Sequence, residues 1–337
     1  MKKIVRTLCC FAARPDAGTE VRLHVLADRL TAAGYQVQTL RVCSPGLSPA
    51  ELDAAVRDPA ALLSLGSVPF EDVDALLSSV CCVDRVAFNT DLTRADIGAE
   101  HVRLLFRMIA EKPAATFLFA YVFDHVASSP YFPSARYERD GFSIGLQATD
   151  LAAGCASLDQ WLRRMEAAWQ ELASMFESEP DFLGIDSSIA PLYEGDSSLV
   201  HFVRRLGYAL AEAVTSDLFL RMTTFIKTHN PRPVGLCGLM FPCLEDFELA
   251  TEYDRGGFPL ERNLFASLQC GLGIDTYPIG VDQDPERVTQ VLRLVQALAA
   301  RFHKPLSVRF VSDGVARIGE RTDFRNRYLK DVTVRPL

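Results

Sequence analysis

Short apolar runs and longer amphipathic segments alternate along almost the whole chain. The short runs have the composition or the two-residue period of strands, and the longer segments repeat apolar residues every three or four positions, as helices do. We expect strands at residues 4–11, 36–42, 83–89, 116–122, 142–146, 182–185, 233–240, 272–274 and 306–311, with an edge strand at 331–334. We expect helices at residues 20–33, 70–81, 96–111, 158–177, 198–213, 216–226, 245–253, 259–268 and 285–301.

This alternation defines the expected fold class. Strands that alternate with helices are typical of α/β proteins with substantial parallel pairing. No segment rich in Gly, Ser or Pro divides the chain into separate parts. We therefore expect one α/β domain over residues 1–337, and a barrel built from two halves is the favoured arrangement.

Composition and charge narrow the classes of function. Hydrophobic residues make up 49% of the 337 residues and charged residues 23%, which is ordinary for a globular protein. The net charge of −8 lacks the basic footprint that nucleic-acid binding needs, and no Lys/Arg run suggests a membrane surface. No stretch is apolar for 18 residues, so we expect no membrane span. A small molecule is the expected partner, and a homo-oligomer is compatible with these features.

The N-terminus and the cysteines indicate the compartment. Arg6 interrupts the apolar run that follows Lys2 and Lys3, which leaves that run too short for the core of a signal peptide. Nine cysteines are present, an odd number, and no C-x-x-C occurs. Reduced thiols in a cytoplasmic protein are the better interpretation of this pattern.

Two similar phrases mark the most informative candidate site. Phe182-Leu-Gly-Ile-Asp-Ser187 and Gly271-Leu-Gly-Ile-Asp-Thr276 each lead from apolar residues into an aspartate and a hydroxyl, and a Pro-containing loop follows. Asp186 and Asp275 are therefore expected at the carboxyl ends of two strands, where α/β folds form their sites. Two such carboxylates can act as acid and base, or bind a hard divalent cation. The alternative is that each carboxylate accepts hydrogen bonds within a turn.

Residues near these aspartates complete the expected site. Ser187 and Thr276 are the expected substrate-binding hydroxyls because they directly follow the aspartates. Glu245 follows a third apolar strand, so it can join Asp186 and Asp275 in acid/base chemistry or in binding a cation. The alternative for Glu245 is a solvated first turn of a helix, where acidic side chains suit the helix dipole.

Further candidates lie on a loop and near other strands. His125 lies in a polar and aromatic loop and is the best candidate for a general base, and Tyr131 of the same loop is an expected substrate-binding residue. Cys270 is a candidate nucleophile or proton donor, although a small core residue is the more common role of such a cysteine. Arg309 can bind a substrate carboxylate in a fork geometry, and the alternative is an exposed arginine at a barrel edge.

The sequence lacks the common cofactor and nucleophile motifs. No G-x-G-x-x-G and no G-x-x-x-x-G-K-(S/T) occurs, so nucleotide binding has no motif support. No His or Cys pair has the spacing of zinc ligands, and no G-x-S-x-G elbow is present. No cofactor is firmly indicated, and a divalent cation is the one candidate.

Several blocks, in order over nearly the whole chain, resemble one family. They are Val5–Leu8, Gly34–Arg41, Ser129–Pro133, Phe142–Leu146, Gly184–Pro191, Gly238–Asp246, Cys270–Thr276 and Lys304–Leu306. Together they resemble the DUF711 family, also called UPF0210. The resemblance implies a pyruvate formate-lyase-like fold, which is an α/β barrel of about ten strands surrounded by helices. It implies no particular reaction.

The glycyl-radical loop of the pyruvate formate-lyase-like enzymes has no counterpart in this sequence. The nearest segment, Val311-Ser-Asp-Gly-Val-Ala316, lacks the flanking pattern, so we expect no glycyl radical. We expect a non-radical enzyme that acts on a small polar metabolite at the barrel mouth by acid/base chemistry, of the lyase, isomerase or hydrolase type. The alternative is a non-catalytic module that binds a small molecule or a protein on the same fold.

Overall fold

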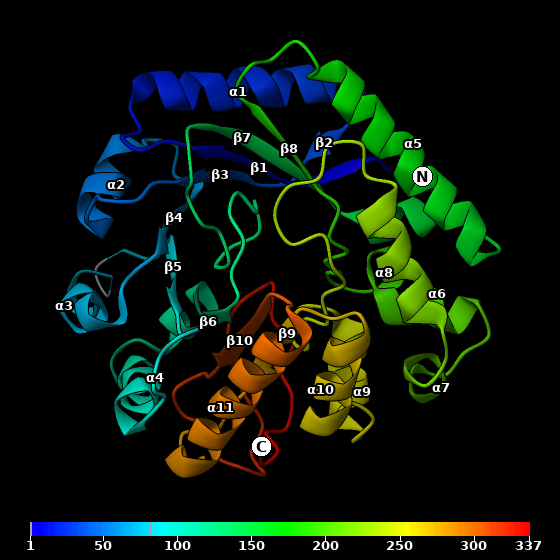
Figure 1. Ribbon diagram of the computed structural model, residues 1–337. Helices are drawn as coiled ribbons and strands as arrows, with labels where there is room; N and C mark the ends of the chain where they lie inside the picture. Colours follow the sequence, from blue (N-terminus) through cyan, green and yellow to red (C-terminus); the bar gives the residue numbers. More distant parts are fainter. Residues whose placement is uncertain (1, 81–82) are drawn as a thin grey trace.

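The strands form one mixed sheet, and helices lie around it (Figure 1). The computed structural model describes residues 2–80 and 83–337. Within them the sheet has ten strands in the order β8-β7-β1-β3-β4-β5-β6-β10-β9, and β2 pairs with β1 beside this path. The strands are β1 (Ile4–Phe11), β2 (Gln36–Val37), β3 (Leu40–Cys43), β4 (Leu62–Ser67), β5 (Val86–Asp91), β6 (Phe119–Phe123), β7 (Gly141–Leu146), β8 (Phe182–Asp186), β9 (Gly273–Pro278) and β10 (Leu306–Val311).

The sheet consists of two groups of strands that run in opposite directions. In the first group, β1, β3, β4, β5 and β6 are all parallel. In the second group, β7 is parallel to β8, and β9 is parallel to β10. The two groups meet at antiparallel seams between β1 and β7 and between β6 and β10. The expected α/β class, with about ten strands inside a layer of helices, is therefore confirmed.

The sheet itself is open between its edge strands β8 and β9. Isolated parallel bridges cross this opening and join Ile185 to Pro233 and Leu239 to Gly271. The segment 233–242 therefore lies between the two edge strands in the place that a further strand would take. It gives the open sheet a barrel-like form made of two halves.

Helices surround the strands on the outside (Figure 1). In α11, Asp284 accepts a hydrogen bond from the Glu286 amide, and Pro285 occupies the first turn, so the chain can begin the helix without an unpaired amide there. Its buried residues recur at helical spacing from Val288 to Ala299. The helices are α1 (Ala17–Ala32), α2 (Pro49–Ala55), α3 (Phe70–Val80), α4 (Ala99–Glu111), α5 (Leu158–Met175), α6 (Leu199–Arg205), α7 (Leu210–Val214), α8 (Leu218–Thr228), α9 (Phe247–Asp254), α10 (Leu260–Gln269) and α11 (Pro285–Phe302).

Several expected elements differ from the structure for local reasons. Residues 113–118 form a 3-10 helix that Pro113 begins, so β6 starts only at Phe119. Residues 233–240 make isolated bridges in place of a regular strand, because Pro233 removes a donor and Gly235 takes a φ of 74°.

Three further differences concern strands. The sequence pattern does not predict β4, although residues 62–67 form it, because its short apolar run lies outside any clear period. Residues 36–42 divide into β2 and β3. Residues 331–334 contribute only an isolated bridge between Arg321 and Thr333. The expected helix at 70–81 ends at Val80 in the structure, and residue 81 lies outside the described residues.

The loop of residues 124–140, between β6 and β7, lies within the barrel-like sheet. Side chains of the strands donate hydrogen bonds to its main-chain carbonyls. The Thr7 hydroxyl donates to the Pro130 carbonyl over 3.0 Å, and the Asn89 amide donates to the Pro133 carbonyl over 2.7 Å. These interior polar side chains explain how irregular backbone can be buried at the centre of the fold.

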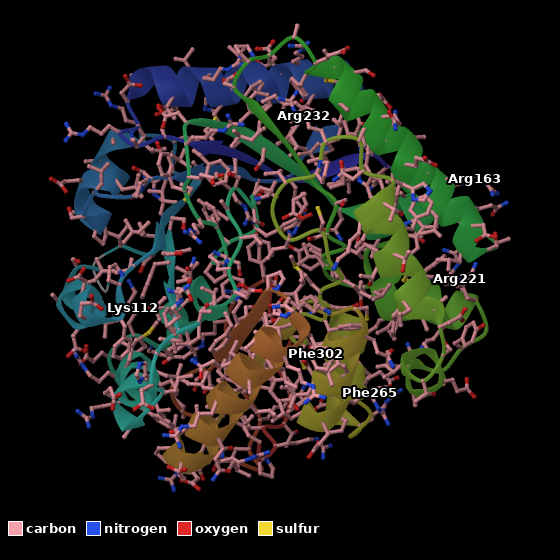
Figure 2. All side chains as sticks on the ribbon, in the orientation of Figure 1. Lys112, Arg163, Arg221, Arg232, Phe265 and Phe302 are labelled. Carbon is pink, nitrogen blue, oxygen red and sulfur yellow. The ribbon has the colours of Figure 1, made fainter. Side chains whose placement is uncertain are left out.

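Side chains fill the remaining space between sheet and helices (Figure 2). Trp161 and Trp169 of α5 are fully buried in the main hydrophobic core. The seven cysteines that the structure describes are all free thiols. No helix in residues 2–80 and 83–337 is long and apolar enough to cross a membrane.

Candidate active site

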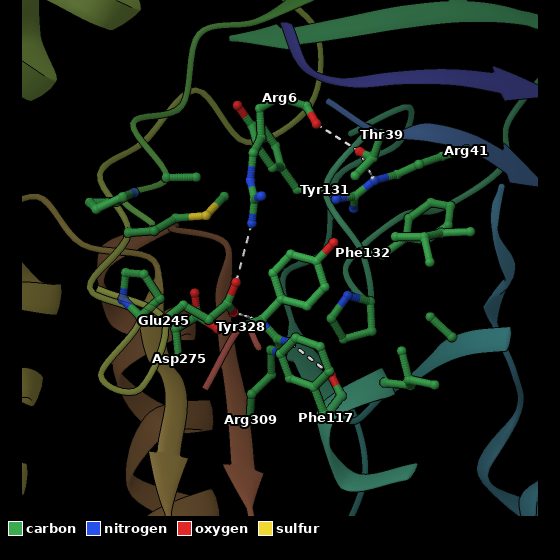
Figure 3. A pocket seen from close by; sticks show the side chains of 18 of the residues that line it. Arg6, Thr39, Arg41, Phe117, Tyr131, Phe132, Glu245, Asp275, Arg309 and Tyr328 are labelled. Atoms are coloured by element: carbon green, nitrogen blue, oxygen red, sulfur yellow. Dashed lines mark hydrogen bonds and ion pairs between the residues drawn. The ribbon is translucent and has the colours of Figure 1, made fainter. Parts of the chain in front are cut away.

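A cavity within the barrel-like sheet is lined by charged side chains from both groups of strands (Figure 3). Its volume is about 80 Å³. Arg6 on β1 and Arg41 on β3 come from the first group. Asp275 on β9 and Arg309 on β10 come from the second group, and Glu245 comes from the turn before α9. Much of the remaining wall is apolar or aromatic and includes Phe117, Phe132, Pro133, Met240 and Tyr328.

A bulge in β1 places Arg6 in this cavity. Between Val5 and Thr7, β1 has one residue more than its partner strand β7. A bulge of this kind redirects a side chain relative to the regular alternation of a strand. As a result, Arg6 lines the cavity while the next residue, Thr7, also points inward and binds the interior loop.

A second irregularity places Asp275. Between Ile274 and Tyr277, β9 has two residues where β10 has only Arg309. Thr276 takes up the extra length with a left-handed φ of 39°. The Asp275 carboxylate then faces the neighbouring strand, where its Oδ1 lies 2.7 Å from Nη1 of Arg309.

Glu245 lies between two arginines. Its Oε2 is 3.3 Å from Nη2 of Arg6, and its Oε1 is 3.2 Å from Nη1 of Arg309. The Arg309 Nη2 donates to the Phe117 carbonyl over 2.8 Å, which fixes the orientation of the guanidinium. The side chains of Arg6, Glu245 and Arg309 are only 8%, 9% and 7% exposed. These charges therefore interact with little screening by water.

Burial and neighbouring charges change the protonation of these groups. Burial raises the pKa of Glu245, and the positive charge of Arg309 opposes that rise. Burial is the main cause that lowers the pKa of Arg41 to about 10, and the nearby positive charge of Arg6 contributes to this shift. Glu245 therefore takes up a proton more readily than an exposed glutamate does.

Four of the predicted site residues lie together at this cavity. They are Asp275, Glu245, Arg309 and Tyr131. The Glu245 carboxylate is buried, so the alternative of a solvated first helical turn is wrong; Asp246 is the residue that caps α9. Tyr131 lines the cavity, while its hydroxyl donates to two main-chain carbonyls.

Asp186 lies elsewhere, although it occupies the corresponding place in the repeated phrase. It is fully buried and does not line the cavity. Its carboxylate accepts hydrogen bonds from the Ser129 hydroxyl, from the amide and hydroxyl of Ser188, and from the amides of Leu236 and Cys237, all within 3.0 Å. The contacts from Ser188 are those of the turn alternative, and the contacts from Ser129, Leu236 and Cys237 join β8 to the interior loop and to the segment 233–242 as well.

The other predicted residues do not line the cavity either. The Ser187 hydroxyl donates to the Ile226 carbonyl over 2.8 Å. Thr276 is buried, and its Oγ1 has no hydrogen-bond partner among the described residues. Burial raises the pKa of Cys270 to about 12, and its thiol donates to a carbonyl of α10, so it has the character of a core residue. Burial lowers the pKa of His125 to about 4.

The structure also bears on the candidate cation and on the radical loop. In residues 2–80 and 83–337, no group of three or more His, Cys, Asp and Glu side chains is arranged to hold a metal ion. The structure therefore gives no support to a cation shared by Asp186, Asp275 and Glu245. Gly314, in the segment nearest to a glycyl-radical loop, lies against Pro113 and is not part of the cavity wall.

Sequence reasoning missed three of the arginines in the cavity wall, Arg6, Arg41 and Arg85. A signal was available for Arg6 and Arg41. Each is a charged residue inside a short, otherwise apolar run that forms a strand, in Ile4–Phe11 and Leu40–Cys43. A charged residue in such a buried run needs a polar interior to face, because burying an unpaired charge is costly.

Comparison with known proteins identifies the family. The model of the family described as "Uncharacterised ACR (DUF711)" matches residues 72–325. The chain belongs to the DUF711 family. The DUF711 match includes Glu245, Asp275 and Arg309 of the cavity, whereas Arg6 and Arg41 precede it.

Two relatives support this assignment to DUF711. A UPF0210 protein of Pyrobaculum arsenaticum is 24% identical over 290 residues, which cover 76% of this chain and 63% of the relative. A UPF0210 protein of Pyrobaculum aerophilum is 26% identical over 154 residues, which cover 44% of this chain and 34% of the relative. The chain therefore spans less than two thirds of the length of either relative.

Proposed function

We propose that this DUF711 protein is an enzyme that transfers a proton to or from a small polar metabolite in the cavity, with Glu245 as the acid/base residue. The observation that carries the proposal is the position of Glu245, which is buried between Arg6 and Arg309 at the cavity wall. A catalytic acid or base works best when its pKa lies near the working pH, and burial raises the pKa of Glu245 in that direction.

The neighbouring charges give each residue a role in this proposal. Asp275 binds Arg309 and so fixes the guanidinium that holds Glu245. When Glu245 removes a proton from a carbon next to a carbonyl or carboxyl group, the C–H electron pair moves toward the substrate oxygen and makes it negative. Arg6 and Arg41 at the cavity supply positive charge for that oxygen. The lyase and isomerase types both begin with this proton transfer.

Hydrogen–deuterium exchange tests the proposal without knowledge of the product. The protein is incubated in D₂O with a panel of small 2-oxo acids, 3-oxo acids and 2-hydroxy acids, and loss of the carbon-bound proton is followed by proton NMR. We expect at least one compound to exchange faster with the protein, and we expect Glu245→Gln to slow this exchange by about 100-fold or more.

A matched variant distinguishes loss of the catalytic group from disturbance of the fold. Glu248 is a partly buried glutamate that pairs with Arg204 outside the cavity, so Glu248→Gln should exchange at the wild-type rate. Equal exchange by wild type and Glu245→Gln would overturn the role of Glu245. Binding of ligands with no exchange of any compound in the panel would favour the non-catalytic module.

A further inference from the structure

We propose that the cavity binds a small monocarboxylate, whose carboxylate group is held by Arg41 beside Arg6 and whose apolar part lies against Phe132 and Met240. This inference rests on the proposed function in one respect, since it names the substrate class of the same cavity. It concerns binding, and it can be tested without turnover.

Arg41 is buried among neutral partners. This residue is only 5% exposed, and its guanidinium donates to the Thr39 hydroxyl over 3.1 Å and to the Pro130 carbonyl over 3.3 Å. Its Cζ lies 5.0 Å from the centre of the Phe132 ring. All of these partners are neutral, and no carboxylate pairs with Arg41 in the described part of the chain. A buried charge without a counter-ion is costly, so an anionic ligand at this position would be strongly favoured.

The other arginines of the cavity differ from Arg41 in this respect. Arg6 pairs with Glu245, Arg309 pairs with Asp275 and Glu245, and Arg85 pairs with Asp53. Two of these guanidinium groups, those of Arg6 and Arg309, nevertheless keep a buried Nε that has no hydrogen-bond partner within residues 2–80 and 83–337. Both residues line the same cavity as Arg41.

The balance of charge indicates the charge of the ligand. Four arginines line the cavity, and Asp53 neutralises one of them, Arg85. The guanidinium groups of Arg6, Arg41 and Arg309 then remain with the carboxylates of Glu245 and Asp275. With both carboxylates ionised, one positive charge is left uncompensated, which matches a ligand with a single negative charge. A carboxylate fits the planar fork of a guanidinium with two parallel hydrogen bonds. A phosphate monoester carries more negative charge near neutral pH than this site balances.

The walls and the volume limit the rest of the ligand. The cavity of about 80 Å³ is adjoined by a second cavity of about 20 Å³ that shares Phe132 and Met240 with it. Leu236, Phe241 and Leu272 give the second cavity an apolar wall, and the paired Asp275 and Arg309 line both cavities. Figure 3 shows Arg6 and Arg41 in the upper part of the view, and Asp275 and Arg309 in the lower part beside Phe117. A short apolar group therefore fits on the side away from Arg41.

Isothermal titration calorimetry with butyrate and butyramide tests this inference directly. The two probes have nearly the same shape, and only butyrate carries a charge. We expect butyrate to bind at least 10-fold more tightly than butyramide, and Arg41→Gln to remove this preference while butyramide affinity stays the same. Inorganic phosphate should not displace butyrate. Equal affinity for both probes, or displacement by phosphate, would overturn the inference.

Arg232 provides the matched control for Arg41. Its Cζ lies 4.7 Å from the centre of the Phe182 ring, and it donates to the Phe182 carbonyl, so it resembles Arg41 in its contacts but lies outside the cavity (Figure 2). Arg232→Gln should bind butyrate as wild type does. Circular dichroism and thermal unfolding of both variants verify the fold. If Arg41→Gln fails to fold, Arg41→Lys serves, because it keeps the charge but loses the fork and should bind butyrate at least 3-fold more weakly.

The outcomes for the two proposals are separate. Butyrate binding that depends on Arg41, with no proton exchange of any compound, would leave this inference standing and overturn the proposed function. Proton exchange that depends on Glu245, with no preference for carboxylates over amides, would do the reverse. Glu245→Gln should bind butyrate at least as tightly as wild type, because it removes a negative charge from the cavity.

Discussion

Asp186 and Asp275 end the same Gly-Ile-Asp phrase on strands β8 and β9, yet their surroundings are opposite. Asp186 is fully buried and accepts hydrogen bonds from five neutral donors. Asp275 lies at the cavity and faces the guanidinium of Arg309. The segment 233–242 lies between the two strands, and it turns its amides toward Asp186 but continues past Asp275 into Glu245.

The role of each aspartate is therefore set by the segments beside its strand and not by the Gly-Ile-Asp phrase. Beside β8 lie a hydroxyl of the interior loop and two backbone amides, which make Asp186 a joint between three segments. Beside β9 lies β10 with Arg309 opposite the bulge, and this places Asp275 in the network of charges. The same local motif can therefore serve assembly in one place and chemistry in another.

The largest expected effect is on stability at Asp186. Asp186→Ala leaves several buried donors without an acceptor, and each such donor costs about 1–3 kcal/mol, so we expect a loss of at least about 3 kcal/mol in the free energy of unfolding. Asp275→Ala should cost less, because Arg309 keeps Glu245 and the Phe117 carbonyl as partners. Urea unfolding followed by circular dichroism measures both. An equal loss in the two variants would contradict the comparison.

The next effect concerns catalysis at Asp275. Asp275→Asn weakens the contact that fixes Arg309, so we expect proton exchange to fall by about 10-fold, which corresponds to about 1.4 kcal/mol. Proton NMR in D₂O gives the rate. The variant Arg309→Lys provides a check, because it keeps the positive charge but loses the planar fork that Asp275 binds. Adding Asp275→Asn to this variant should reduce the rate of proton exchange little further. Fully additive effects would show that the two residues act separately.

The pH dependence of stability sharpens the part played by Glu245. Because burial raises its pKa in the folded protein, the folded state binds a proton that the unfolded state, with a pKa near about 4.3, releases. The stabilisation is therefore complete below that unfolded pKa and is lost as the pH rises through the raised folded pKa. Relative to Glu245→Gln, wild type should lose free energy of unfolding over this range of pH. A difference that stays constant with pH would contradict the raised pKa.

The smallest effect compares the residues that follow the two aspartates. Thr276 has a φ of 39°, a conformation that costs an L-residue about 1–2 kcal/mol in the folded protein. Glycine avoids this strain, but it loses more chain entropy on folding, which costs only about 0.5–1 kcal/mol. Thr276→Gly should therefore stabilise the protein by up to about 1 kcal/mol. Ser187→Gly should destabilise it by about 1–2 kcal/mol, since it also removes a hydrogen bond to the Ile226 carbonyl. Thermal unfolding of the two variants should shift in opposite directions.

The fold could be predicted largely from periodicity, and the site only in part. The repeated phrase correctly located β8 and β9, but the expected position at a strand end is right only for Asp186, because β9 continues past Asp275 to Pro278. The apolar runs located most of the sheet. Which strand residues face the cavity depends on bulges in β1 and β9, and a bulge has no clear sequence period. Arg6 was visible only as an interruption of an apolar run. Its partner Glu245 is 239 residues away, and no local pattern connects them.

The interior loop of residues 124–140 offers its main-chain carbonyls to the strands, and this has a consequence for how the protein can diverge. A change of side chain in the loop leaves those carbonyls in place, so Thr7 and Asn89 keep their partners. Phe132 and Tyr131, in contrast, contribute their side chains to the cavity wall. Substitutions at Tyr131 and Phe132 can therefore change which ligands the cavity binds. The hydrogen bonds from the surrounding strands to the loop stay the same.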